Sequence, residues 1–356
     1  MGQLTLASQG GFEQYGKKTR REKFLEEMDR ILPWAELESL IEPYYPKAGN
    51  GRPPVGLSIM LRIYFLQHWF NLSDPAAEEA LYDSPALRRF AGVDLGRAAA
   101  PAIKSYVAVV RDQTALDPSN QVNEPALRGM LTQVLKMVTG KADPASAWRV
   151  LVRTSDIVGL VHTDHLNRTH PELVELVKAT LREAGVPEKN IWMVQGSPDK
   201  VKECNALISL PALKAHWLTG IGTVFKNYIT FTGSPSSYHD ANNAKLGEIW
   251  NMPHVKGKTK LVLVDALRSL CDKGPQPDPR YMWQYKGLIA GTDPVAVETV
   301  CLKVIMQKRQ ALRGEPWPLS PPPMVVEMAD KRYGLGTSNL EEIQINRVGW
   351  MENVLV

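Results

Sequence analysis

The chain has 356 residues, of which 44% are hydrophobic and 22% are charged, and its formal net charge at pH 7 is +4. This length allows two domains, and the composition is that of a globular protein with a buried core. The small positive charge does not by itself require a nucleic-acid partner, and no apolar run approaches the roughly 20 residues that span a bilayer, which excludes a membrane protein.

The first part of the chain, up to about Arg97, predicts short helices separated by turns. One helix is expected from about Arg21 to Leu32, because Pro33 disfavours helical geometry in the residue before it. Others are expected at 34–41 and 55–70, and after Asp74-Pro75 and Ser84-Pro85, where proline stands in the first helical turn. These elements predict a small all-helical domain at residues 1–97.

A dense basic run, "KKTRREK", precedes the first predicted helix at residues 17–23. Acidic residues follow it at once, so the run fits a solvated helix start. It also fits a contact surface for DNA, and the residues alone leave both interpretations open.

From residue 106 onward, apolar strands alternate with amphipathic helices. Strands are expected at 106–112 and 156–161 and in the runs "NIWMV", "ALISL", "KLVLVDAL", "YKGLIAG" and "LEEIQINRV". This alternation predicts an α/β fold, a mainly parallel sheet with flanking helices, preceded by the small all-helical domain. We place a junction at residues 98–105, which include Ala98-Ala99-Ala100-Pro101, and the α/β domain at 106–356.

Polar residues gather where the predicted strands end, which is where ligands of such sheets bind. Lys214 and His216 follow "ALISLP", and "TGIGTVFKN" then places two glycines at an expected helix start before a second lysine. Backbone donors, a helix N-terminus and two lysines fit an anion cradle; a tight turn with solvent-facing lysines is the alternative. The candidate ligand-binding residues are Lys214, His216, Gly220, Gly222, Lys226, Asn227, His239, Asp265, Thr292 and Asp293. Asp293 also fits a helix cap.

Metal and cluster sites are not predicted. Cys204, Cys271 and Cys301 are far apart and form no Cys-x-x-Cys pair, so no iron–sulfur cluster is expected from this chain alone. The loop "HTDHLNRTH" fits a metal site or a polar loop without a shared purpose, and no metal ligand is assigned. Free thiols suit a reducing compartment, and we expect a cytoplasmic protein. The cofactor is unknown.

The strings "ILPWAELESLIEPYYPKAGNGRPP" and "MLRIYFLQHWFNLSDPAAEEALYDSPALRRFAGVDL" resemble the N-terminal domain of insertion sequence 5 family transposases, over residues 12–97. The resemblance implies recognition of mobile-element ends. It also implies salt-sensitive phosphate contacts by Lys17, Lys18, Arg20, Arg21 and Arg52. Members of that family continue into a ribonuclease-H-like domain with three metal-binding carboxylates. Here "AAAPAIKSYVAVV" follows instead, so we expect the catalytic domain to be missing.

The strings "ALISLPALKAHWLTGIGTVFKNY", "LVLVDALRS", "GLIAGTDPVAVETV" and "YGLGTSNLEEIQI" resemble domain of unknown function 362, over residues 102–350. The resemblance implies an α/β fold and a redox-linked or iron–sulfur-associated role. Val161 stands where that family carries a lysine, and a long stretch is missing before Pro198. The domain is therefore interpreted as internally shortened.

Together these observations predict a fusion of a DNA-binding head without its catalytic domain to an α/β body of uncharacterised function. DNA is the partner expected for the head, a small anionic ligand is expected for the body, and no membrane partner is expected. Two alternatives stay open: a transposase fragment that binds mobile-element ends without strand transfer, and the product of a degenerate gene without a selected function. The sequence does not decide whether the body is an enzyme.

Overall fold

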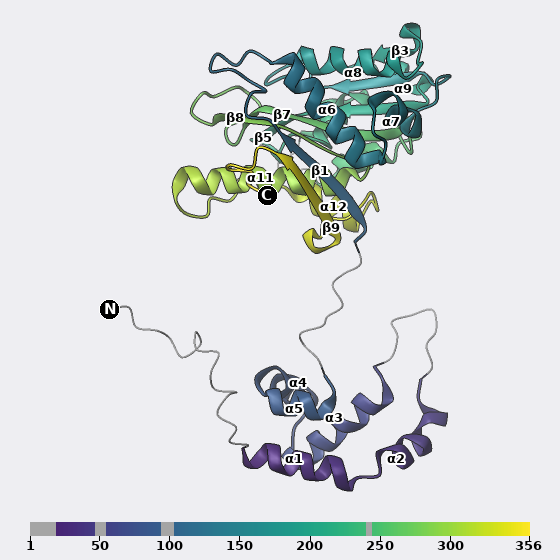
Figure 1. The fold of residues 1–356 in the computed structure, drawn as a ribbon, viewed down its shortest axis with the longest axis vertical. Coiled ribbons are helices and arrows are strands. Elements are labelled where there is room, and N and C mark those ends of the chain that lie inside the picture. Colours follow the sequence, from purple (N-terminus) through teal and green to yellow (C-terminus); the bar gives the residue numbers. More distant parts are fainter. Residues whose placement is uncertain (1–18, 47–54, 94–102, 240–243) are drawn as a thin grey trace. The chain divides into compact units, whose positions relative to one another are not determined.

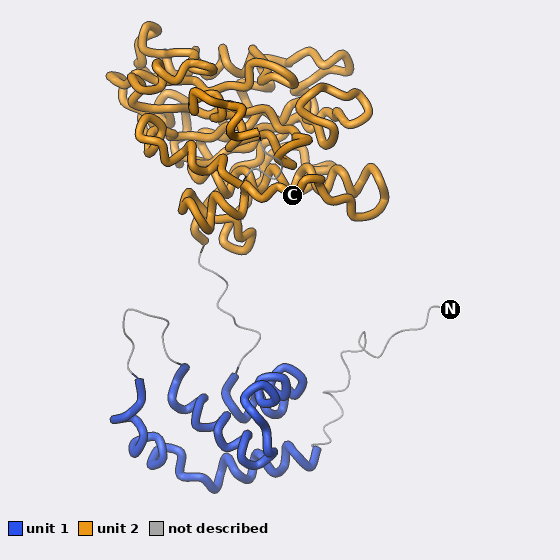
Figure 2. Tube along the Cα trace, turned by 180° about the vertical axis from the view of Figure 1, so that it is seen from behind, with its two compact units in different colours: residues 1–100 blue, residues 101–356 orange. Residues whose placement is uncertain are grey.

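The fold is known from a computed structural model, which describes residues 19–46, 55–93, 103–239 and 244–356. The chain divides into two compact units, residues 1–100 and residues 101–356 (Figure 2). Each unit has its own hydrophobic core.

The first unit is all-helical in its described part. Its helices are α1 (Arg20–Ile31), α2 (Trp34–Ile41), α3 (Leu57–Phe70), α4 (Asp74–Asp83) and α5 (Pro85–Ala91), with a 3-10 turn, η3 (Glu42–Tyr44), after α2. Thr19 caps α1 in a capping box with Glu22, and the hydroxyls of Ser73 and Ser84 cap α4 and α5. The predicted helical domain is confirmed.

The second unit is built on a mixed sheet (Figure 1). The strands are β1 (Ser105–Arg111), β2 (Val158–His162), β3 (Ile191–Met193), β4 (Ala206–Leu210), β5 (Ala212–His216), β6 (Gly220–Ile221), β7 (Thr259–Leu270), β8 (Met282–Gly291) and β9 (Ile343–Gly349). The strand order along the main path of the sheet is β3-β2-β4-β7-β8-β1-β9. β5 pairs with the carboxyl-terminal part of β7. The predicted α/β fold is confirmed.

Strand direction explains why the sheet is mixed. β8 pairs antiparallel with both of its neighbours, β7 and β1, whereas the other neighbouring pairs of the main path are parallel. The loop at 271–281, which contains no helix, joins β7 to β8, and antiparallel neighbours need no helical crossover between them. Because β2 pairs in parallel with both β3 and β4, the carboxyl ends of these three strands lie at one edge of the sheet.

Helices cover both faces of this sheet. Along β1, Val107 and Val109 belong to one core cluster and Val110 belongs to the other, because successive side chains of a strand point to opposite faces. One face packs against α6 (Glu124–Thr139), α7 (Pro144–Leu151) and α8 (Pro171–Glu183). The other packs against α10 (Leu246–Trp250), α11 (Pro294–Arg313) and α12 (Met324–Lys331). None of the described helices is long and apolar enough to cross a membrane.

Candidate ligand-binding pocket

A pocket of about 310 Å³ lies beside the carboxyl ends of β2 and β3 in the second unit. Its lining includes six residues that the sequence predicted, Lys214, His216, Gly222, Lys226, Asn227 and His239. It also includes polar residues that were not predicted as ligand contacts, namely Thr163, His165, Gln195 and Thr230. This position agrees with the rule that open α/β sheets bind ligands at the carboxyl ends of their strands.

Each strand end contributes its own polar group. Thr163 directly follows β2, Gln195 lies two residues beyond β3, and Lys214 is in β5. Lys226 and Asn227 open a 3-10 helix, η6 (Lys226–Thr232).

Lys214 is 5% exposed and has hydrogen-bond partners. Its Nζ donates to the backbone oxygen of Leu166 at 2.9 Å and to that of Asn167 at 3.4 Å. Burial lowers the pKa of Lys214 to about 8, and the nearby Asp164 carboxylate acts in the opposite direction. At neutral pH this lysine is a fixed positive charge on one wall of the pocket.

Lys226 is 8% exposed, and its buried Nζ has no hydrogen-bond partner among the described residues. Burial, and to a lesser extent the positive charge of Lys214, lowers the pKa of Lys226 to about 8. The amine is therefore still mostly protonated at pH 7. A buried ammonium without a partner is costly, so this position favours an acceptor that the described protein groups do not supply.

His216 is a neutral donor rather than a cation. Burial first, and then the positive charge of Lys226, lowers the pKa of His216 to about 3. The backbone N–H of Leu218 donates to its Nδ1 at 3.1 Å, so the ring proton is on Nε2. A Cβ on Gly222 would lie 3.0 Å from the Cβ of His216, so Gly222 allows the imidazole to pack closely against the backbone.

Asn227 has a structural role at the base of the pocket. Its Nδ2 donates to the backbone oxygen of Val161 at 2.7 Å, and the hydroxyl of Thr163 donates to its Oδ1 at 3.1 Å. Only one end of the Gln195 amide is hydrogen-bonded. Its Nε2 donates to the backbone oxygen of Asn227 at 3.4 Å, but its buried Oε1 has no partner in the part of the chain that the structure describes.

The expected helix start after Thr219 is wrong. Gly220 and Ile221 form β6, which pairs antiparallel with β5, and the nearest helical turn begins at Lys226. Gly220 has φ of +72° and closes a tight hairpin loop opposite His216, a conformation that glycine adopts without strain. The pocket therefore has no helix N-terminus at this glycine.

Asp265 lies outside the pocket lining and stabilises a loop. It is 1% exposed and accepts hydrogen bonds from the backbone N–H and the Nδ1–H of His170, both at 2.7 Å. Burial lowers the pKa of His170, but the Asp265 carboxylate outweighs it and the net shift is upward. This pair fixes the start of α8 against β7.

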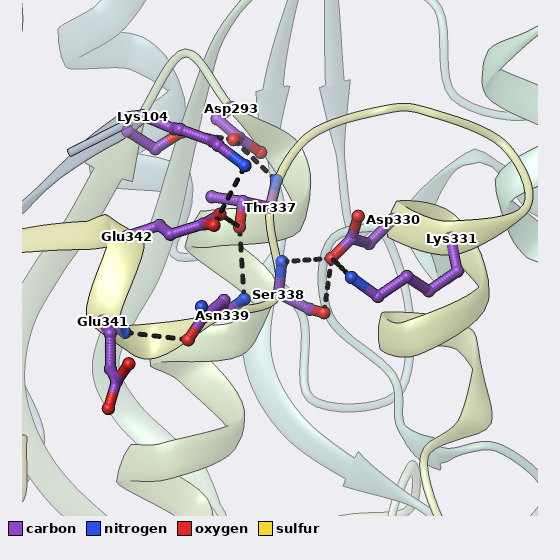
Figure 3. A network of polar contacts seen from close by, with 10 residues as sticks. Lys104, Asp293, Asp330, Lys331, Thr337, Ser338, Asn339, Glu341 and Glu342 are labelled. Carbon is purple, nitrogen blue, oxygen red and sulfur yellow. Dashed lines mark hydrogen bonds and ion pairs between the residues drawn. The ribbon is translucent and has the colours of Figure 1, made fainter. Parts of the chain in front are cut away.

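Thr292 and Asp293 line a different cavity, of about 570 Å³, together with Lys104 and Ser105. Asp293 caps α11, since its Oδ1 accepts from the backbone N–H groups of Val295 and Ala296, both at 2.9 Å. Its Oδ2 accepts from the hydroxyl of Ser105 and from the backbone N–H of Thr337, within the polar network of Figure 3. The contacts of Asp293 are thus those of a helix cap.

The structure describes two of the five candidate DNA contacts. Lys17, Lys18 and Arg52 lie outside the described residues. Arg20 and Arg21 are exposed in the first turn of α1, where the guanidinium of Arg21 lies 5.1 Å from the centre of the Phe70 ring.

The cysteines and histidines are dispersed. Cys204, Cys271 and Cys301 are buried and unpaired, and burial raises the pKa of Cys204 and that of Cys271 to about 11. Over the described ranges, no three His, Cys, Asp or Glu side chains are placed to hold a metal ion. In the loop after β2, His165 pairs with Asp164, whereas His170 pairs with Asp265.

Two family models match this chain. Residues 13–111 match a transposase domain (DUF772), and residues 172–303 match a domain of unknown function (DUF362). Both resemblances expected from the sequence are confirmed. The first match extends across β1, which belongs to the second compact unit. No solved structure is significantly similar to the chain.

Proposed function

We propose that the α/β body binds a small anion, a carboxylate or a phosphate, in the pocket lined by Lys214 and Lys226. The observation that carries this proposal is the buried Nζ of Lys226, which lacks a hydrogen-bond partner within the described ranges. Lys214, whose Nζ already donates to two carbonyl oxygens, adds a second positive charge to the same pocket. An anionic oxygen would offset the cost of burying Lys226.

The size of the pocket sets the size of the ligand. A volume of about 310 Å³ is at the small end of the range for ligand sites, about 300 to 1,000 Å³. Neutral His216 would contribute an uncharged hydrogen-bond donor. The ligand is therefore a small molecule rather than a dinucleotide or a polymer.

Calorimetric titration of the whole chain with inorganic phosphate and with propionate tests the proposal. Lys226→Met removes the amine but keeps a side chain of similar length, and we expect it to weaken binding roughly ten- to a hundred-fold. Lys189→Met, at an exposed lysine at the opposite end of β3, is the matched control and should bind like the wild type. Absence of binding to the wild type, or equal binding by Lys226→Met, would overturn the proposal.

We further propose that residues 1–97 are a DNA-binding head, joined through residues 98–105 to the body at 106–356. The match of residues 13–111 to a transposase domain and the exposed Arg20 and Arg21 support this role. The expectation that the head lacks strand-transfer activity rests on the sequence, in which the first metal-binding carboxylate of that family is replaced by the "AAAPAIKSYVAVV" segment.

The other expected functions stay predictions. A redox-linked or iron–sulfur-associated role rests on the resemblance to the second family. The cytoplasmic location rests on the reduced state expected of the cysteines. A folded chain that bound DNA but no anion would favour the alternative of a transposase fragment with a passive body. Binding of neither would favour the product of a degenerate gene.

A further inference from the structure

Two buried polar atoms in the pocket are unpartnered within the described part of the chain, and they are of opposite kinds. The Nζ of Lys226 is a donor, and the Oε1 of Gln195 is an acceptor. Both residues line the pocket of about 310 Å³, and the amide of Gln195 lies against the backbone of Asn227, the residue next to Lys226. One small molecule in this pocket therefore lies beside both residues.

The orientation of the Gln195 amide follows from its neighbour. Its Nε2 donates to the backbone oxygen of Asn227 at 3.4 Å. Turning the amide over would place its carbonyl oxygen against that backbone oxygen, and two acceptors repel each other. The side-chain oxygen is thus free to accept a hydrogen bond from a ligand.

Several neighbouring polar groups are already used. The amide of Asn227 bonds to Val161 and Thr163, and the hydroxyl of Thr163 also accepts from the backbone N–H of Ala212 at 3.2 Å. Lys214 donates to two backbone oxygens. A ligand that satisfies both residues therefore carries an anionic acceptor for Lys226 and a hydrogen-bond donor for Gln195.

We propose that the ligand of this pocket is a small hydroxylated acid, with its anionic group at Lys226 and a hydroxyl that donates to Oε1 of Gln195. This inference rests on the proposed anion-binding function and adds the hydroxyl. An anion without a donor leaves the Gln195 oxygen buried and unsatisfied, which costs binding free energy.

Matched pairs of ligands test the inference with the whole wild-type chain. Lactate differs from propionate by one hydroxyl, and glycerol 3-phosphate differs from propyl phosphate by two. By calorimetry, the hydroxylated member of at least one pair should bind about ten-fold more tightly, the effect of one buried hydrogen bond. A preference for the hydroxyl in the lactate pair alone would identify the acid as a carboxylate, and a preference in the phosphate pair alone would identify it as a phosphate.

Variants test whether Gln195 causes the preference for the hydroxylated ligand. Gln195→Met removes the acceptor at similar volume and should abolish the preference for the hydroxyl, with propionate or propyl phosphate bound at least as tightly as by the wild type. Lys226→Met should weaken both members of a pair together. Circular dichroism and thermal melting verify that each variant is folded.

The two proposals fail in different ways. If the wild type binds both members of each pair equally, the hydroxyl inference is overturned and the anion proposal stands. If Gln195→Met is folded and keeps the full preference, the hydroxyl has another partner and the inference is also overturned. If the wild type binds no member, the anion proposal itself fails.

Discussion

The backbone N–H of Val224 donates a hydrogen bond to Oε2 of Glu298 at 2.9 Å, and this contact joins α11 to the loop that leads into Lys226. Glu298 is fully buried, and its Oε1 has no hydrogen-bond partner in the described part of the chain. Burial raises the pKa of Glu298 to about 8, so the carboxyl group is mostly neutral at pH 7.

Glu298 should make the chain less stable as pH rises from about 4.5 to 8. Its pKa in the folded state is higher than in the unfolded state, so between these pH values the unfolded chain releases a proton that the folded chain keeps, and stability falls as pH rises. The slope from this group is at most about 1.4 kcal/mol per pH unit. Glu298→Gln keeps a neutral acceptor for Val224 and should remove this slope.

Urea unfolding at pH 5, 6.5 and 8 measures this effect. Glu298→Gln should gain stability relative to the wild type as pH rises, whereas Glu327→Gln, at an exposed position on α12, should follow the wild type throughout. Parallel stability curves for the wild type and Glu298→Gln would show that Glu298 is ionised in the folded chain.

Anion binding should weaken as pH rises through about 8. The pKa values of Lys214 and Lys226 are each lowered to about 8, so both lysines lose their positive charge above this pH. The neighbouring His216 is already neutral, because its pKa is lowered to about 3, and it adds no further step. Affinity should be flat from pH 6 to 7 and then fall by up to about ten-fold per pH unit for each lysine.

Calorimetry with propionate measures this dependence, because propionate remains ionised over the whole range. The same titration in buffers with different heats of ionisation should detect proton uptake near pH 8. A constant affinity from pH 7 to 10 would show that neither lysine carries the binding.

Lys226→Met should stabilise the chain at pH 7. Burial lowers the pKa of Lys226 from 10.5 to about 8, so the unfolded chain binds more protons between these values and the wild type gains stability as pH rises through them. Below pH 8 the cost of burying the ammonium is fully present, and it corresponds to at most about 3 kcal/mol. Methionine avoids this cost and fills a similar volume.

Chemical unfolding at pH 7 and at pH 10.5 separates this electrostatic gain from a packing effect. The gain in the free energy of unfolding from Lys226→Met should be largest at pH 7 and should disappear at pH 10.5. Lys189→Met, at an exposed lysine, should leave the free energy of unfolding unchanged at both pH values. An equal loss of stability at both pH values would mean that the lysine stem contributes packing only.

The sequence could predict the fold and the position of the pocket, because strand ends and apolar runs are local signals. Lys214 was identifiable because it follows the apolar run "ALISLP", and Lys226 because it comes at the end of the glycine-containing run "TGIGTVFK". Thr163 and Gln195 also follow strand ends, but single uncharged residues in polar loops give no comparable signal. Their contribution depends on side chains far apart in the chain, such as Asn227.

The sequence could not separate the polar residues that bind a ligand from those that stabilise the fold. Asp265 was expected at a strand end but lies within β7, and Asp293 follows β8; their oxygens accept hydrogen bonds from His170, Val295 and other protein groups. The expected helix after Thr219 was wrong for a similar reason. "TGIG" fits either a helix start or a hairpin, and the pairing of β5 with β6 decides between them.

DNA binding by the head should depend on Arg20 and Arg21 and should be sensitive to salt. Both side chains are exposed in the first turn of α1, so each can reach a phosphate without disturbing the core. Each phosphate contact contributes about −0.9 to the slope of the logarithm of the association constant against the logarithm of salt concentration. Arg20→Ala with Arg21→Ala should weaken binding to all sequences alike and reduce the slope by up to about 2.

Fluorescence anisotropy of the whole chain on duplex DNA at several salt concentrations measures both quantities. Arg128→Ala with Arg182→Ala removes two exposed arginines from the body and should leave affinity and slope unchanged. Because Arg21 also lies over Phe70, Arg20→Ala alone is measured too, and half of the slope change is expected from it. A larger loss from the arginines of the body than from those of the head would place the DNA contact on the α/β unit. A slope that neither pair alters would exclude these four arginines as phosphate contacts.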